Sequence, residues 1–138
     1  MAFTIRTREQ LFAVAVGMAR AQEDRGIHPA AAIRFGLISA LLAMAGIPQP
    51  DWVSGFRTLT QQAALRTVVG FDGKFLKPAQ RSWHTRGLAY DLRVASPSFN
   101  VFALLWTALG GRDGRDFLSP DPGHLDFPIK GLEPEAAF

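Results

Sequence analysis

The stretch RSWHTRGLAYDLR, residues 81–93, joins a turn to a segment of alternating apolar residues. The alternation in GLAYDLRV predicts a strand over residues 87–94, with Asp91 on its polar face. Gly87 can let the chain fold tightly just before this strand. His84 could therefore reach Asp91, so the stretch predicts an imidazole and a carboxylate at the start of one strand.

The rest of the chain predicts four helices and two further strands around this segment. Thr7 with Gln10 forms a capping-box pattern, and Ser96 before Pro97 is a helix start. We expect helices over 7–26, 28–46, 59–69 and 96–111, strands over 51–58, 87–94 and 124–128, and loops between them. This order predicts an α+β domain, with a small, mostly antiparallel sheet covered by helices on one side. The tail, 129–138, is expected to be frayed.

The second predicted helix is apolar on nearly every side, which indicates that it is the central buried one. Gly36 in its interior suggests close packing. His28 precedes a proline at the helix start and is expected to be a surface or capping residue. Trp83 and Trp106 are interpreted as packing residues rather than as a substrate platform.

Composition limits the chemistry that the chain can support. The 138 residues suit one domain, and the absence of cysteine excludes disulfides, thiolate metal sites and cysteine nucleophiles. A metal would be held by carboxylates and by His28, His84 or His124. The net charge of +3 and the pI near 10.0 suit approach to an anionic polymer such as cell wall. The basic residues are scattered, so we do not expect nucleic-acid binding.

No apolar run reaches the roughly 18 residues that a membrane span needs. The segment LFAVAVGMARA, residues 11–21, follows two arginines and ends in A-x-A, as a short signal peptide would. Glu9 and Gln10 interrupt that pattern, and we prefer an amphipathic helix. A signal peptide stays open.

His84, Asp91 and His124 form a candidate metal site. His124 begins the last predicted strand, and two histidines with one carboxylate and an open fourth position are typical of catalytic zinc. Asp121 lies three residues before His124 and could act as a general base. By spacing alone, structural hydrogen-bonded histidines remain the alternative.

Three segments resemble motifs of the zinc peptidases that cut peptidoglycan stem peptides. SWHTRGLAYD, 82–91, is similar to their S-x-H-x-x-G-x-A-x-D motif. SGFRTLTQQAAL, 54–65, resembles S-G-[YF]-R-[ST]-x-x-x-Q, and DPGHLDF, 121–127, resembles D-x-x-H-x-[ED]. The family includes D-alanyl-D-alanine carboxypeptidases, vancomycin-resistance D,D-dipeptidases and phage L-alanyl-D-glutamate endolysins. The resemblance covers about residues 50–128.

The resemblance implies a role for each matching residue. His84, Asp91 and His124 would bind zinc, and Asp121 would be the general base that takes a proton from the attacking water. Asp126 is interpreted as an acceptor that orients a ligating histidine.

Arg57 would stabilise the developing oxyanion or grip the substrate carbonyl. Without the resemblance, an ion pair between Arg57 and Asp51 would be the simpler interpretation. Ser82 would bind substrate or hold the histidine. Gln61 or Gln62 would brace the arginine, and we assign Gln61 to substrate binding.

Two acidic residues remain outside these motifs: Asp113 and Asp116, in a Gly/Arg loop, are expected to face water. The resemblance implies a hedgehog/DD-peptidase type of fold in one zinc peptidase domain, residues 1–138. Residues 1–49 are a helical preamble, 50–128 the motif-bearing region and 129–138 the tail.

The function implied is hydrolysis of peptidoglycan stem peptides or cross-links by a monomeric phage or prophage lysis enzyme. We expect it to be made in the host cytoplasm and to act on the cell wall after release by a holin. Endopeptidase and carboxypeptidase action stay open. The alternative is a non-catalytic binding or virion structural module that keeps the zinc fold.

Overall fold

The computed structural model describes residues 5–138, so residues 1–4 of the predicted preamble lie outside it. Helix α1, Arg8–Glu23, begins at Thr7, whose hydroxyl accepts from Gln10 N at 3.1 Å, while Gln10 Oε1 accepts from Thr7 N. The predicted capping box is confirmed. Helix α2, Pro29–Met44, begins at His28, whose Nδ1 accepts from Ala30 N at 3.0 Å. His28 is therefore a capping residue, as predicted.

Helices α1 and α2 approach each other closely at Gly36. A Cβ on this glycine would overlap the carbonyl oxygen of Ala15 and would lie 2.9 Å from Ala19 N, in the backbone of α1. The close packing predicted for Gly36 is confirmed. Ala19 and Ile27 join the same hydrophobic core as Leu88 on the sheet side, so the helical preamble shares one core with the motif-bearing region.

Within residues 5–138, four short strands form one antiparallel sheet in the order β1-β2-β4-β3. They are β1 Trp52–Ser54, β2 Ala89–Leu92, β3 Arg112–Asp113 and β4 His124–Asp126. The α+β class and the antiparallel sheet are confirmed, whereas the resemblance to the hedgehog/DD-peptidase fold stays a prediction. Strand β3 lies where we predicted only a loop.

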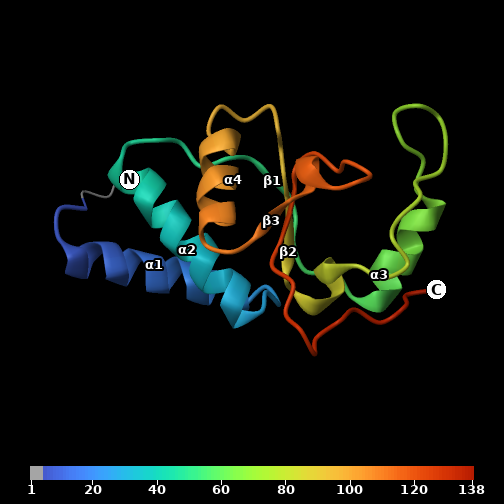
Figure 1. Ribbon diagram of the computed structural model, residues 1–138, viewed down its shortest axis with the longest axis horizontal. Helices are drawn as coiled ribbons and strands as arrows, with labels where there is room; N and C mark the ends of the chain where they lie inside the picture. Colours follow the sequence, from blue (N-terminus) through green and yellow to red (C-terminus); the bar gives the residue numbers. More distant parts are fainter. Residues whose placement is uncertain (1–4) are drawn as a thin grey trace.

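The two faces of the sheet differ in chemistry. Tyr90 and Leu125 are fully buried on the face covered by helices, where Phe35 of α2 stacks on Tyr90 with ring centroids 4.5 Å apart. Helix α4, Phe99–Ala108, lies on the same side of the sheet as α2 (Figure 1). It adds Trp106, whose ring meets Tyr90 edge to face. Trp106 is thus a packing residue, as predicted. The opposite face carries the polar side chains that alternate with these.

Several predicted elements are shorter than expected. Helix α1 ends at Glu23 rather than near residue 26, and α3, Leu59–Ala64, passes into a 3-10 turn rather than continuing to 69. Helix α4 begins at Phe99, with Ser98 and not Ser96 as the residue before its first turn. The Ser96 hydroxyl accepts a hydrogen bond from Asp51 N, and Phe99 N donates to the backbone oxygen of Ser96.

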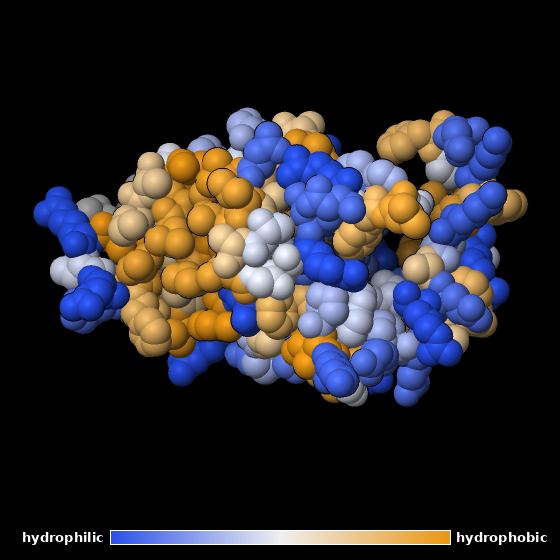
Figure 2. Space-filling model, viewed as in Figure 1, coloured by the Kyte–Doolittle hydropathy of each residue, from blue (hydrophilic) through white to orange (hydrophobic). Residues whose placement is uncertain are grey.

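Helix α2 is central, as predicted, since it packs between α1 and α4 through residues such as Ala32 and Ile38. Part of its surface is open, because Ile33 and Met44 are 40% and 49% exposed. Figure 2 shows apolar side chains gathered over the end of the molecule built by α1, α2 and α4. No helix within residues 5–138 has the length and apolar character to cross a membrane.

The tail is not frayed as predicted. Residues 136 and 137 run antiparallel to Arg81 and Gln80, and Arg81 Nη1 donates to Pro134 O at 3.0 Å. Arg86 donates to Glu133 O, so the tail is fixed along the segment that leads to His84. Its backbone polar groups find partners in this segment, which the Gly and Pro content did not indicate.

Candidate metal centre

A 3-10 turn, η2 (Trp83–Arg86), delivers His84 to the start of β2. Ser82 caps the turn by accepting from His84 N at 3.3 Å, and Gly87 closes it with φ of 67°. A Cβ on Gly87 would overlap the backbone oxygen of Gly26, so both the left-handed conformation and the space require glycine here. The Ser82 hydroxyl therefore holds the histidine segment, one of the two roles predicted for it.

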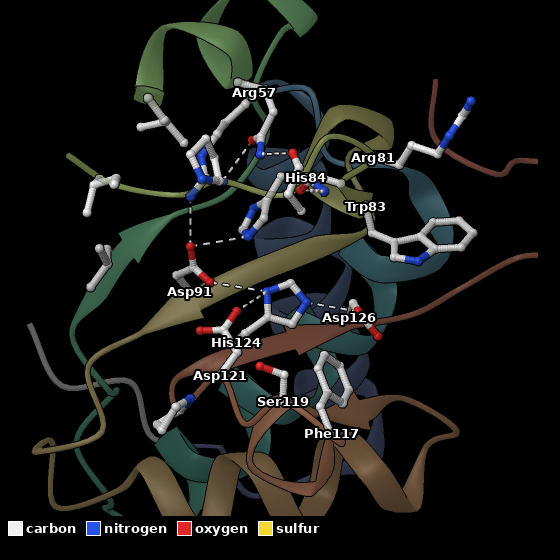
Figure 3. Close-up of a pocket in the computed structure, with 18 of the residues that line it drawn as sticks. Arg57, Arg81, Trp83, His84, Asp91, Phe117, Ser119, Asp121, His124 and Asp126 are labelled. Carbon is white, nitrogen blue, oxygen red and sulfur yellow. Dashed lines mark hydrogen bonds and ion pairs between the residues drawn. The ribbon is translucent and has the colours of Figure 1, made fainter. Parts of the chain in front are cut away.

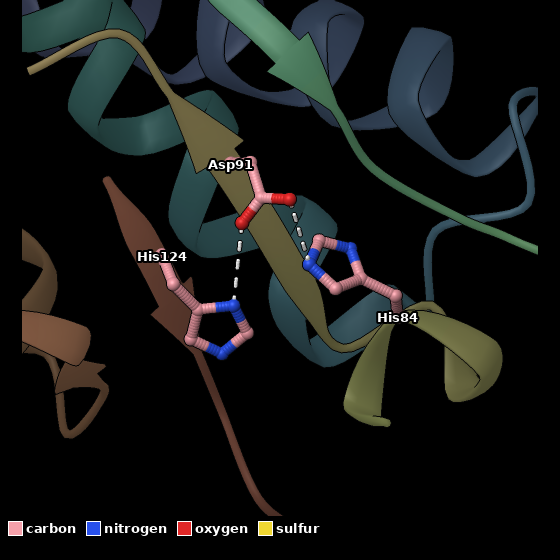
Figure 4. Close-up of side chains that lie close together, drawn as sticks. All are labelled: His84, Asp91 and His124. Atoms are coloured by element: carbon pink, nitrogen blue, oxygen red, sulfur yellow. Dashed lines mark hydrogen bonds and ion pairs between the residues drawn. The ribbon is translucent and has the colours of Figure 1, made fainter. Parts of the chain in front are cut away.

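The pairing of β2 with β4 places the other two ligands opposite each other. Asp91 is the cross-strand partner of His124, so their side chains project from the same face. Figure 4 shows the Asp91 carboxylate between the rings of His84 and His124. The structure thus brings the three predicted metal ligands together at one point.

The ligand atoms have a spacing that suits zinc. His84 Nε2 lies 3.2 Å from Asp91 Oδ2, and His124 Nδ1 lies 3.3 Å from Asp91 Oδ1. Ligands that bind zinc tetrahedrally at about 2.0–2.1 Å lie roughly 3.3 Å from one another. All three ligand atoms lie within 4.8 Å of one another. A metal ion fits this donor set.

Each histidine has an outer partner that fixes which nitrogen faces the ligand cluster. His84 Nδ1 donates to Gly55 O at 2.7 Å, which leaves Nε2 for a metal. His124 Nε2 donates to Asp126 Oδ2 at 2.8 Å, which leaves Nδ1 for the metal. Asp126 therefore lies where its predicted orienting role requires. Such outer partners are typical of metal-binding histidines.

The carboxylate of Asp91 is held in its ionised form. Burial opposes its charge, but hydrogen bonds with His124, His84 and Ser54 outweigh burial and keep the Asp91 pKa far below its usual range. Burial likewise opposes protonation of His124, but Asp126 and Asp91 outweigh it and raise the His124 pKa to about 9. In the metal-free site at neutral pH, the imidazolium of His124 therefore donates to both carboxylates.

Arg57 belongs to the same cluster and does not pair with Asp51, so that simpler interpretation is wrong. Its Nη2 donates to Asp91 Oδ2 and to the Ser54 hydroxyl, each at 2.8 Å. Its Nη1 donates to Gln62 Oε1 at 3.1 Å, and its side chain is 20% exposed. The arginine is thus braced beside a metal ligand and still reaches solvent.

Of the two candidate glutamines, Gln62 braces Arg57 and is buried. Gln61 instead accepts from Thr58 N at 2.8 Å in a capping box at the start of α3, where it is exposed. The pocket lining described below includes Gln62 and not Gln61. The structure therefore places Gln61 away from the site to which we assigned it.

Asp121 lies at the rim of the cluster. Its Oδ2 is 3.8 Å from His124 Nδ1, and its side chain is 65% exposed. The backbone around it is held by a hydrogen bond from Asp121 N to Gly114 O at 2.8 Å. In Figure 3 the Asp121 carboxylate points toward Asp91 and His124. A general base at this place would have a solvent-exposed side chain on a hydrogen-bonded backbone.

These side chains line one open cavity of about 830 Å³. Trp83, half-buried, packs against the core and also lines this cavity, so its packing role is not its only contact. Further lining residues come from the segments on both sides of the metal centre: Val53, Leu65, Leu76, Lys77, Arg81, Ser82, Arg112, Phe117 and Pro120. The volume lies in the range of small-molecule and peptide sites.

Sequence reasoning missed the contribution of β3. Asp113, expected to face water, is only 6% exposed and accepts from Arg115 N and from its guanidinium. Asp116 is exposed, as predicted. Arg112 binds Asp126 beside the metal centre. A two-residue strand has no periodicity, so only its pairing with β4 reveals the role of these residues.

No protein-family model matches the chain, and no curated protein matches it. The fold and the cluster therefore define this protein as an α+β domain with a candidate His-Asp-His metal centre.

Proposed function

We propose that the protein is a zinc-dependent peptidase that hydrolyses peptidoglycan stem peptides or cross-links. The observation that carries the proposal is the convergence of three separated segments on one cavity. They contribute Arg57 from the first motif, His84 and Asp91 from the second, and Asp121 and His124 from the third. The sequence motifs alone predict a role for each of these residues.

The donor set favours zinc over magnesium and calcium. Two imidazole nitrogens and one carboxylate oxygen suit zinc, whereas magnesium and calcium prefer oxygen ligands only. Three protein ligands leave one position for substrate or water, which is the arrangement of catalytic zinc. When bound, zinc would polarise the scissile carbonyl and lower the pKa of a water molecule toward about 7.

The residues around the ligands would transfer the proton, stabilise the developing negative charge and contact the substrate. Asp121 would accept the proton of the attacking water and pass it to the leaving amine, because its exposed carboxylate reaches over the cluster. Arg57 would stabilise negative charge that develops on the carbonyl oxygen, since a braced guanidinium beside the ligands needs little rearrangement to do so. Ser82 lines the cavity and would contact substrate there.

Peptidoglycan as the substrate rests on the three motifs, with the positive net charge as a weaker argument. We propose a monomeric enzyme of phage or prophage origin that acts on the cell wall after release from the host cytoplasm. L-alanyl-D-glutamate endopeptidase and D-alanyl-D-alanine carboxypeptidase activities are both compatible with an open cavity.

Mass spectrometry of purified muropeptides tests the proposal. Zinc-loaded protein should release peptide or D-alanine fragments, a chelator should stop the release, and zinc should restore it. The Asp121→Asn variant serves as the inactive control and His28→Ala as the active one, because His28 caps α2 away from the cavity. A protein that binds zinc but leaves both sacculi and defined stem peptides intact would instead be the non-catalytic module.

A further inference from the structure

We infer that Arg112 is a positioning residue of the metal centre: it holds Asp126, and through Asp126 it fixes the His124 ring with Nδ1 toward the other two ligands. Arg112 lies in β3, outside the three motifs that suggested the site. The inference rests on the metal centre of the proposed function but does not depend on the substrate.

The first step is the contact between Arg112 and Asp126. These residues are paired across β3 and β4, and Arg112 Nε and Nη2 donate to Asp126 Oδ1 and Oδ2, both at 2.8 Å. This two-point contact fixes the plane of the carboxylate as well as its position. Asp126 is 1% exposed, so water cannot replace the arginine without a large penalty.

The second step is the contact between Asp126 and His124. Asp126 Oδ2 accepts from His124 Nε2 at 2.8 Å, while Nδ1 on the other side of the ring lies 3.3 Å from Asp91 Oδ1. A carboxylate paired with a guanidinium can only accept, so Nε2 keeps its proton and Nδ1 presents its lone pair to a metal. A ring flipped by half a turn would lose the bond to Asp126.

A third contact closes the arrangement around the ligand. The Arg112 guanidinium carbon lies 4.8 Å from the centroid of the Phe117 ring, and Phe117 meets His124 edge to face with centroids 5.7 Å apart. Figure 3 shows Phe117 next to His124 and Asp126. Arginine suits this place better than lysine because its planar group can pair with a carboxylate and pack on a ring at once.

The Arg112 side chain is 50% exposed, which alone would describe a surface ion pair of little consequence. The buried partner and its direct contact with a ligand distinguish this pair. Loss of an outer partner typically weakens metal affinity by about 10- to 100-fold.

The test measures zinc affinity and the ring nitrogen that binds zinc. In the parent, nitrogen-15 spectra of the zinc-loaded protein should show His124 bound through Nδ1. Arg112→Gln should bind zinc roughly 10-fold more weakly and show a mixture of Nδ1 and Nε2 ligation. Arg20→Gln, which removes an exposed charge on α1, should match the parent in both measurements.

A double-mutant cycle separates positioning from a general effect on the fold. If Arg112 acts through Asp126, then Arg112→Gln should reduce zinc affinity less than about twofold further in the Asp126→Asn background. Fully additive losses, or an equal loss in Arg20→Gln, would overturn the inference. So would Arg112→Gln with parental zinc affinity and pure Nδ1 ligation.

The experiment also separates a folding failure of the variant and a parent without zinc from a failure of the inference. If Arg112→Gln does not fold, as judged by circular dichroism, Arg112→Lys takes its place: it keeps the charge, lacks the two-point contact, and should show the same changes. Lysine with parental affinity and ligation overturns the inference. A parent that binds no zinc contradicts the metal centre itself, whereas a parent that binds zinc but cleaves no stem peptide contradicts only the proposed activity.

Discussion

Zinc binding should tighten as the pH rises from 7 to about 9, because zinc and a proton compete for Nδ1 of His124. Burial opposes protonation of this ring, but Asp126 and Asp91 outweigh burial and raise its pKa to about 9. A ligating histidine must lose its proton. At pH 7, two units below that pKa, removing the proton costs on the order of 3 kcal/mol, or about 100-fold in apparent affinity.

The assay is competition between the protein and a chelator whose pH-dependent zinc affinity is known. The apparent dissociation constant should fall about one factor of ten per pH unit more steeply below pH 9 than above it, because His124 is already neutral above pH 9. Ionisation of a zinc-bound water would add a slope that continues above pH 9, so it would not produce this break. The Asp126→Asn variant should show the break at a lower pH, since one of the two stabilising carboxylates is gone.

The same raised pKa makes a linked prediction for the metal-free protein. His124 has an unfolded-state pKa of 6.5 and a folded-state pKa of about 9. Its contribution to the free energy of unfolding is fully present below pH 6.5 and is lost as the pH rises through 9. Denaturation with urea should reveal a loss of roughly 3 kcal/mol over that window. For the zinc competition assay, a dissociation constant that does not change between pH 7 and 9 would refute the argument that a proton on His124 competes with zinc.

Three further predictions concern single substitutions. Alanine at any of the three candidate ligands should lower the zinc content below about one per chain by mass spectrometry, whereas His28→Ala should leave it unchanged. Asp121→Asn should keep zinc and lower turnover by roughly 100-fold or more. Asp126→Asn should weaken zinc binding, with a smaller effect on the zinc-saturated rate. The reverse result would mean that the general base is misassigned. Gly36→Ala should lower the free energy of unfolding by about 1–3 kcal/mol because its Cβ meets the α1 backbone, whereas Gly17→Ala, with nothing within 4 Å, should raise it by up to about 1 kcal/mol.

The predictable part of the site is the part that local patterns encode. Alternation along β2 placed Asp91 on the face opposite Tyr90, and Gly87 marked the turn that brings His84 alongside. The meeting of His84 and Asp91 with His124, by contrast, depends on the register of β2 against β4. The sequence offered His124 as a third ligand by residue type and by the resemblance, but it did not give the register, because 33 residues separate Asp91 from His124.

What could not be predicted depends on contacts between distant segments. Arg112 acquires its partner only when β3 pairs with β4. The choice between Gln61 and Gln62 depends on the phase of α3: its start at Thr58 turns Gln61 back to the helix end and leaves Gln62 facing Arg57. The tail finds its partners along residues 80–86, which no composition rule could indicate.

The hydrogen bonds and ion pairs around Asp91 would keep this site in shape if no metal were bound. Asp91 is satisfied by Arg57, Ser54 and the two imidazoles, and its strand is fixed from the other face by the packing of Tyr90. A metal would therefore replace one proton rather than organise a disordered loop. Structural zinc sites in small domains contribute folding energy outright, whereas here the apolar core beneath the sheet already holds the ligands. Removal of the metal should accordingly abolish the chemistry while leaving the fold in place.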